Sequence, residues 1–221
     1  MDWDFEVFRW VQMNLRYAWS DPVVRTLADS GLGQVQLFGL LWAIWVRDRP
    51  KGQQIGFAVM FFAVAMASTV REISTYAGVT TGMAALLLIG ASRWIEKREA
   101  VIALIAGAAA GLVRLGVVKL VPRPRPSNYD FVEPLEHLRA ATSFPSGHST
   151  TAAAVGVAIA LLVWHRNRPL ALGALVYVFL VGLSRLASGV HYPSDVLAGW
   201  SLGALFAGLA VFLAQRRERD Q

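Results

Sequence analysis

The sequence lacks cysteine and is poor in charged residues. None of its 221 residues is a cysteine, which excludes disulfide bonds, thiol nucleophiles and thiolate metal sites. Only 16% of the residues are charged, whereas soluble domains usually contain about 25%. Hydrophobic residues make up 55% of the chain, and the mean hydropathy is +0.46. These values exclude an ordinary soluble domain and predict an all-α fold, a polytopic membrane helical bundle.

Apolar runs that approach the length of a membrane-spanning helix recur along the chain. They lie at about 31–47, 53–71, 75–93, 100–120, 147–164, 170–187 and 192–214. We expect one membrane domain over 1–221, made of an N-terminal interfacial segment at 1–30, N-terminal spans at 31–98 and core spans at 99–215. Six and seven spans both fit this pattern. Because aromatic residues alternate with charges in residues 1–20, we expect an interfacial helix there.

The basic residues are concentrated in four short connections between the apolar runs. Eleven of the 21 lie in "RDRPK", "SRWIEKRE", "WHRNRP" and "QRRERD". These connections alternate along the chain and therefore share one side of the membrane, which the positive-inside rule makes the cytoplasm. We expect an integral protein of a bacterial inner membrane. The net charge of +6 is not gathered on one stripe, so binding to nucleic acid is not expected.

Three polar stretches fall on the opposite side, each at the end of an apolar run. They are "KLVPRPRP" at 119–126, "SFPSGHST" at 143–150 and "SRLASGVHYPSD" at 184–195. Ionisable groups at the rim of a membrane are costly and are usually functional. Each stretch alone fits a helix terminus or an interfacial hydrogen bond, but their convergence on one side predicts a shared cleft.

The last stretch places a histidine near a carboxylate. His191 and Asp195 are four residues apart and share a face if they lie on a helix, with Pro193 in its first turn. Asp195 then fixes the tautomer of His191, which leaves the other ring nitrogen free to act as a nucleophile. Arg185 precedes His191 by six residues, and its planar guanidinium suits a phosphate.

The "PSGH" stretch predicts a helix N-terminus that binds an anion. Ser146 is placed as the N-cap, and the backbone N–H groups of Gly147 and His148 then point out of the helix. Gly147 allows the anion to approach closely. His148 stands beside that anion, where it can protonate a leaving oxygen.

A metal centre is the alternative for these histidines. His148, His191 and Asp195 are a possible zinc ligand set. The cationic side chains that share the cleft would repel a metal ion, so we expect no metal and no other cofactor.

Together the three stretches resemble the motifs of the type 2 phosphatidic acid phosphatase (PAP2) superfamily, the membrane lipid phosphate phosphatases. That family's pattern is K-x6-R-P, then P-S-G-H, then S-R-x5-H-x3-D. The second motif is complete from Pro145 to His148, and the third is complete at Ser184, Arg185, His191 and Asp195. The resemblance covers residues 100–214 and implies a core of six membrane helices.

The first motif departs from the family pattern. Arg125 and Pro126 match, but Lys119 precedes Arg125 by six positions instead of seven. Because the prolines end the helix and extend the chain, we expect Lys119 still to point at the phosphate, with Arg123 turned toward headgroups or solvent. The open alternative gives this role to Arg123. For Arg114, which lies deeper in the same run, we expect an ion pair inside the bundle rather than catalysis.

The residues and the resemblance imply the same chemistry, on the non-cytoplasmic face. His191, oriented by Asp195, attacks phosphorus to form a phosphohistidine, while His148 protonates the leaving oxygen and later activates water. The phosphate oxygens are held by Lys119, Arg125, Arg185 and the N–H groups near Ser146 and Gly147. The expected partner is a lipid mono- or diphosphate, with undecaprenyl diphosphate or phosphatidylglycerol phosphate favoured. Transfer of the phosphate to a second lipid is the alternative, and it uses the same residues.

Overall fold

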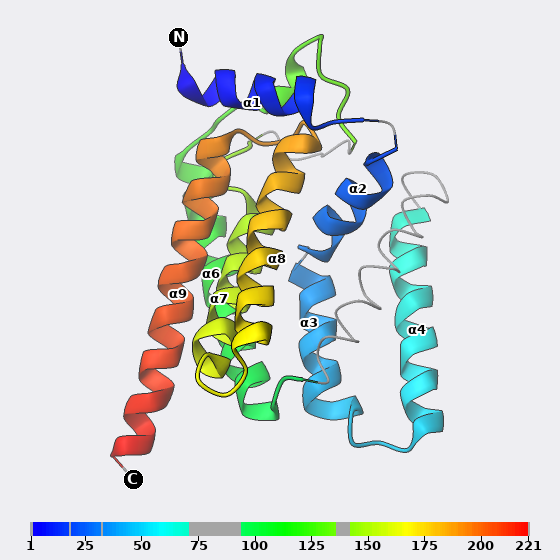
Figure 1. The fold of residues 1–221 in the computed structure, drawn as a ribbon, viewed down its shortest axis with the longest axis vertical. Helices are drawn as coiled ribbons and strands as arrows, with labels where there is room; N and C mark the ends of the chain where they lie inside the picture. The colour runs from blue at the N-terminus through cyan, green and yellow to red at the C-terminus, as the bar shows by residue number, and fades with distance from the viewer. Residues whose placement is uncertain (1, 18, 32, 71–93, 136–141, 221) are drawn as a thin grey trace.

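The computed structural model describes residues 2–17, 19–31, 33–70, 94–135 and 142–220, and within these ranges it is helical with no strand (Figure 1). The predicted all-α fold is therefore confirmed. The elements are α1 (Trp3–Asn14), α2 (Asp21–Ser30), α3 (Gly33–Leu41), the π-helix η1 (Trp42–Val46), α4 (Lys51–Val70), α6 (Lys97–Leu120), the 3₁₀ helix η2 (Pro126–Asn128), α7 (Gly147–Val163), α8 (Arg168–Ala187) and α9 (Pro193–Arg219).

The predicted apolar runs correspond to helices wherever the structure describes them. Among the described residues, the helices α6, α8 and α9 are long and apolar enough to cross a membrane. Two shorter apolar helices are α7 and the segment Val35–Val46. The run predicted at 75–93 lies outside the described residues. Helix α6 ends at Leu120, next to Pro122 and the prolines that follow it, because proline cannot donate the next helical hydrogen bond.

Helix α7 forms the centre of the bundle and packs against α6, α8 and α9. Its buried face is made largely of alanine, and the facing side of α9 presents Gly199, Gly203 and Ala207 at intervals of four. Small residues at this spacing allow two membrane helices to approach closely. A Cβ atom at Gly199 would lie only 2.8 Å from the carbonyl oxygen of Ser146. This close approach joins the start of α7 to the first turns of α9.

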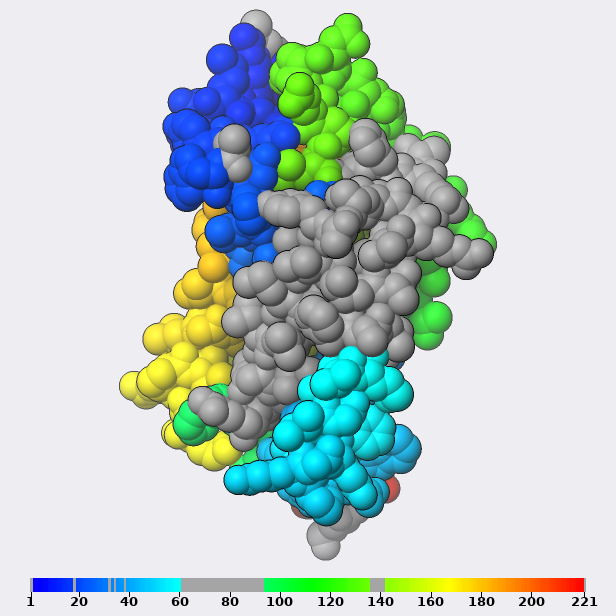
Figure 2. All heavy atoms as spheres, turned by 90° about the vertical axis from the view of Figure 1, so that its right-hand side faces the viewer, coloured from blue at the N-terminus to red at the C-terminus, as the bar shows by residue number. Residues whose placement is uncertain are grey.

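The basic connections share one end of the bundle, as predicted. Lys97 Nζ lies 2.6 Å from Asp48 Oδ2, and Arg166 Nη2 donates to Glu99 at 2.8 Å. The opposite end carries α1, the loop 121–135 and the turn between α8 and α9 (Figure 1). In the side view of Figure 2, residues 2–30 and the loop 121–135 again form one end, and the start of α4 lies toward the other. The three polar stretches therefore meet at a single end.

The N-terminal segment 1–30 contains the helix expected within residues 1–20, α1, and a second helix, α2. Helix α1 lies across the end of the bundle, and α2 turns inward and packs against α8 (Figure 1). Phe8 and Val11 of α1 are buried against the bundle, whereas Trp3 and Trp10 are each 56% exposed. An exposed tryptophan face suits a membrane–water interface, which is where the sequence predicts this helix. The separate helix α2 is not foreseen by the sequence pattern.

Candidate active site

His191 and Asp195 are in contact, although His191 does not lie on a helix. It belongs to the turn between α8 and α9, and α9 begins only at Pro193. His191 Nδ1 lies 3.4 Å from Asp195 Oδ2, which also accepts the backbone N–H of Tyr192 at 2.9 Å. The expectation that the pair shares a helical face is wrong in this detail. The first-turn carboxylate of α9 instead reaches back past its own N-terminus to the histidine.

Both members of this pair are buried, His191 with 2% exposure and Asp195 with none. Burial lowers the pKa of His191 from 6.5 to about 4, and the nearby charges of Arg185 and Arg125 act in the same direction. The hydrogen bond with Asp195 opposes this shift but does not overcome it. The ring is therefore neutral near pH 7, as a nucleophilic nitrogen requires.

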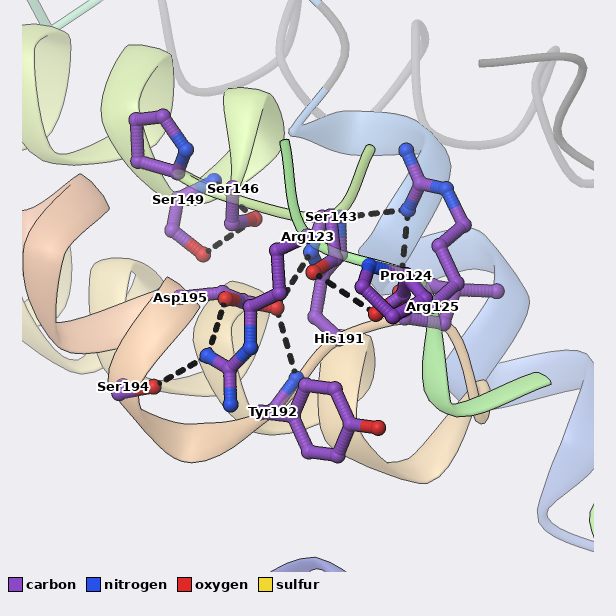
Figure 3. Close-up of polar contacts among 12 residues, drawn as sticks. Arg123, Pro124, Arg125, Ser143, Ser146, Ser149, His191, Tyr192, Ser194 and Asp195 are labelled. Carbon is purple, nitrogen blue, oxygen red and sulfur yellow. Dashed lines mark hydrogen bonds and ion pairs between the residues drawn. The ribbon is translucent and has the colours of Figure 1, made fainter. Parts of the chain in front are cut away.

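Two of the predicted cations lie beside His191. Arg185, in the last turn of α8, is fully buried. Arg125 is 7% exposed, and its Nη1 donates to Val190 O at 3.0 Å and lies 3.3 Å from His191 Nε2 (Figure 3). With Nδ1 facing the carboxylate and Nε2 facing a guanidinium, the hydrogen bonds assign the Nδ1–H tautomer. Nε2 is then the nitrogen with the lone pair.

The "PSGH" stretch begins α7 as predicted. Ser146 is the N-cap, and its Oγ accepts from the backbone N–H and from the hydroxyl of Ser149, at 3.4 and 3.0 Å. The backbone N–H of Ser146 donates to Asp195 O at 3.0 Å (Figure 3 shows both residues). This bond holds the N-terminus of α7 against the turn that carries the His191–Asp195 pair.

A cavity of about 760 Å³ opens between α3, α6 and α7 beside this pair. Its polar end is lined by Arg114, Arg125, Gly147, His148 and His191. Its remaining wall is mainly apolar and includes Leu37, Leu40, Leu104, Leu112, Leu115 and Val155. From Arg114 to Leu104 the wall follows α6 for ten residues, or about 15 Å. The cavity thus joins a cationic end to an apolar trough.

The carboxylates and histidines of the described residues are not clustered as a metal site requires. Within the described ranges, no group of three or more His, Asp or Glu side chains is placed to hold a metal ion. The charges that line the polar end of the cavity are cationic, and such an end suits an anion.

Residues 99–219 match the PAP2 superfamily. The chain belongs to this superfamily. The resemblance seen in the motifs is thereby confirmed, and with it the membrane-embedded helical fold.

The PAP2 relatives include named phosphatases. The lipid A 1-phosphatase of Rhizobium johnstonii is 36% identical over 112 residues, which cover 48% of this chain and 44% of that protein. The decaprenylphosphoryl-5-phosphoribose phosphatase of Mycobacterium tuberculosis is 32% identical over 155 residues, which cover 70% and 84%. The crystal structure of Aquifex aeolicus LpxE shares the fold, with a TM-score of 0.50 and 19% identity over 78% of this chain and 92% of that one. The chain thus spans less than half the length of the lipid A 1-phosphatase that it matches.

The first PAP2 motif is where the structure and the sequence prediction diverge. Lys119 is exposed, and it is not among the residues that line the cavity. Arg123 is not turned toward headgroups or solvent, because it donates to the carboxylates of Asp195 and Asp4. Arg125 therefore lies at the polar end of the cavity without the expected Lys119, and without Arg123, which the open alternative places there.

Arg114 is the site residue that the sequence reasoning missed. It lines the cavity, and its Nε donates to Pro145 O at 3.1 Å. The expected ion pair is not found, since no carboxylate in the described part of the chain pairs with it. The available signal was a single arginine in an otherwise apolar span, which is by default a functional residue.

Proposed function

We propose that this PAP2 protein is a metal-independent membrane lipid phosphatase that forms a phosphohistidine at His191. The observation that carries the proposal is the pairing of a buried, neutral His191 with Asp195 at the cationic end of a cavity whose wall is otherwise mainly apolar. The phosphatases among its relatives support this class of reaction.

The first step is attack by His191 Nε2 on phosphorus. Arg125 Nη1 lies 3.3 Å from this nitrogen. A phosphate in the cavity takes over the donors of Arg125 because a charge-assisted hydrogen bond is stronger than one to a neutral ring. Nε2 is then released to attack. Asp195 stabilises the positive charge that develops on the ring as the P–N bond forms.

His148 supplies the proton that the leaving group needs. It stands at the second position of α7 and lines the polar end of the cavity. As the bond from phosphorus to the leaving oxygen breaks, His148 donates its proton to that oxygen. It then accepts a proton from a water molecule, which attacks phosphorus and returns His191 to its neutral state. The N-terminus of α7 and the nearby guanidinium groups stabilise the equatorial oxygens.

The shape of the cavity supports a lipid as the carrier of the phosphate. Its apolar wall along α3, α6 and α7 has room for acyl or prenyl chains while the phosphate occupies the polar end. We favour undecaprenyl diphosphate or phosphatidylglycerol phosphate. A relative named for a decaprenyl-linked phosphate supports a prenyl tail.

The site belongs, in this proposal, to the non-cytoplasmic face of the bacterial inner membrane, opposite the basic connections. A cysteine placed at Asn128 should react with an impermeant thiol reagent in intact cells, and one at Asn167 should not. The reverse labelling would place the site on the cytoplasmic side. The native chain offers a clean background because it has no cysteine.

The activity is tested by measuring phosphate release from the candidate lipids in detergent with excess EDTA. The proposal expects turnover without metal and without a second lipid. Release only when an acceptor lipid is added would favour the phosphotransferase alternative. Loss of turnover in EDTA that Mg²⁺ or Zn²⁺ restores would contradict the histidine mechanism.

A further inference from the structure

The guanidinium of Arg114 lies against the N-terminus of α7. Its Nε donates to Pro145 O at 3.1 Å, which fixes the planar group beside the first turn of the helix. A Cβ atom added at Gly147 would lie 3.1 Å from Arg114 Cζ and 3.3 Å from its Nη1. Gly147 therefore makes room for this arginine, whose guanidinium lies beside the first residue of α7.

This placement is electrostatically unfavourable without an anion. The N-terminus of a helix carries partial positive charge, so a cation beside it is repelled. A charged side chain within a membrane span adds a further cost unless it is paired or faces a polar cavity. Within the described residues no carboxylate pairs with Arg114, and its neighbours around the cavity include Arg125 and His148. A phosphate bound here would pair with Arg114 and offset its repulsion by the helix N-terminus and by Arg125.

Lys119 is less suited to the same role. It follows Arg114 by five residues on α6, which is about 7.5 Å farther toward the end of the bundle. It stands exposed in the last turn of α6, whereas Arg114 is half-buried in the cavity wall. The loop after α6 places Arg125 in the cavity wall, whereas Lys119 lies in the last turn of α6 and is not among the lining residues.

We propose that Arg114 is the third cationic side chain, beside Arg125 and Arg185, that binds the substrate phosphate. Lys119 and Arg123 do not have this role. The proposal rests on the proposed function, because it concerns the phosphate of that reaction. Arg114 and Arg125 both line the cavity, and Arg185 lies fully buried behind its polar end, near His191. The three arginines place planar pairs of donors around the position of the phosphate.

Two measurements test this assignment on the full-length protein. The first is the kcat and KM of phosphate release, and the second is the rise in melting temperature caused by inorganic phosphate. Arg114→Ala should lower kcat/KM by about a hundredfold, the usual cost of one lost transition-state contact, and should abolish the stabilisation by phosphate. Arg114→Lys should give a kcat/KM and a stabilisation by phosphate between those of the wild type and Arg114→Ala, because lysine keeps the charge but lacks the planar pair of donors.

The matched control is Arg98→Ala, an arginine on the same helix that pairs with Glu218 at the far end of the bundle. It should leave both measurements within twofold of the wild type. Arg114→Gln replaces the alanine variant if that variant does not fold. The inference is wrong if Arg114→Ala or Arg114→Gln keeps a near-normal kcat/KM and stabilisation by phosphate while Lys119→Ala loses both. Lys119 would then be the residue that binds the phosphate.

The phosphate measurement separates this inference from the proposed function. If the wild type hydrolyses no lipid phosphate but is stabilised by inorganic phosphate through Arg114, the activity is wrong and the binding role stands. If Arg114→Ala keeps the full stabilisation by phosphate, the inference is wrong whatever the activity.

Discussion

Arg123 and Asp195 form a direct ion pair, with Arg123 Nη1 2.7 Å from Asp195 Oδ1. The same guanidinium reaches α1, where its Nη2 lies 2.5 Å from Asp4 Oδ2. It also stacks 4.1 Å above the ring of Tyr192 (Figure 3). One oxygen of Asp195 is thus bound by Arg123, and the other faces His191. Arg123 thus holds the carboxylate that contacts His191, the nucleophile of the proposed mechanism, and it is not among the residues that line the cavity.

Replacing Arg123 should therefore affect turnover rather than substrate binding. We expect Arg123→Ala to lower kcat by about a hundredfold with KM changed little, because a small rotation of Asp195 misplaces His191. Arg123→Lys should recover part of the loss, since it keeps one bond to the carboxylate. Steady-state kinetics of phosphate release provide the measurement. A large rise in KM at normal kcat would instead make Arg123 a phosphate ligand.

Asp4 extends this arrangement to the N-terminal helix. It is buried, and it accepts the backbone N–H of Ser194 at 2.7 Å and the Ser194 hydroxyl at 2.6 Å. Asp4→Ala leaves these donors without a partner, so we expect it to destabilise the protein by about 1–3 kcal/mol. Thermal unfolding in detergent measures the effect. The control is Glu6→Gln on the same helix, which should melt like the wild type, and equal melting of the two variants would contradict this role for Asp4.

The low pKa of His191 predicts a titration that is unusual for histidine. NMR of the four histidine rings should show one that stays neutral down to about pH 4, and His191→Gln should remove that signal. Between pH 6.5 and about 4 the unfolded chain binds a proton at this position that the folded chain does not. Stability should therefore fall as the pH falls through this window, and less so in His191→Gln. A His191 that titrates near 6.5 would contradict the buried, neutral nucleophile.

The close packing of α7 on α9 predicts opposite outcomes for two glycines of the same helix. A Cβ atom at Gly203 would overlap the carbonyl oxygen of Thr150, whereas Gly208 has no other atom within 4 Å of an added Cβ. We expect Gly203→Ala to destabilise the protein by about 1–3 kcal/mol, the usual cost of overpacking. Gly208→Ala should leave stability unchanged or raise it, because alanine favours a helix. Equal melting temperatures for the two variants would show that the helices do not approach this closely.

The local features of the site are predictable from the sequence because short motifs encode them. The N-cap at Ser146 and the helix that begins at Pro193 depend on neighbouring residues alone. The positions of the apolar helices likewise follow from composition over windows of about 20 residues. These parts of the fold and the site are therefore predicted with little information from tertiary structure.

The remaining parts depend on contacts between distant segments. Arg123 and Asp4 are 119 residues apart, and no periodicity in either segment connects them. Arg114 lies on an apolar helix without a motif, and its role depends on which face of α6 meets α7. The reach of the chain after Lys119 predicts that its side chain can approach the phosphate, but reach does not determine whether the side chain turns into the cavity. Tertiary packing decides each of these points.

The most direct test of the account is to trap the covalent intermediate. In the proposed mechanism His148 protonates the leaving oxygen and then activates water. A lipid diphosphate releases a lipid phosphate, which leaves with less need of an acid. In His148→Ala the second step should therefore be slowed more than the first, and the phosphoryl group should accumulate on His191. Rapid quenching under alkaline conditions followed by peptide mass spectrometry locates it, because phosphohistidine is stable in base. The account predicts a phosphoryl group on the peptide that contains His191, and its absence in the double variant with His191→Asn. Hydrolysis that continues in His191→Asn, with no phosphoryl group on His191 in any variant, would contradict the mechanism.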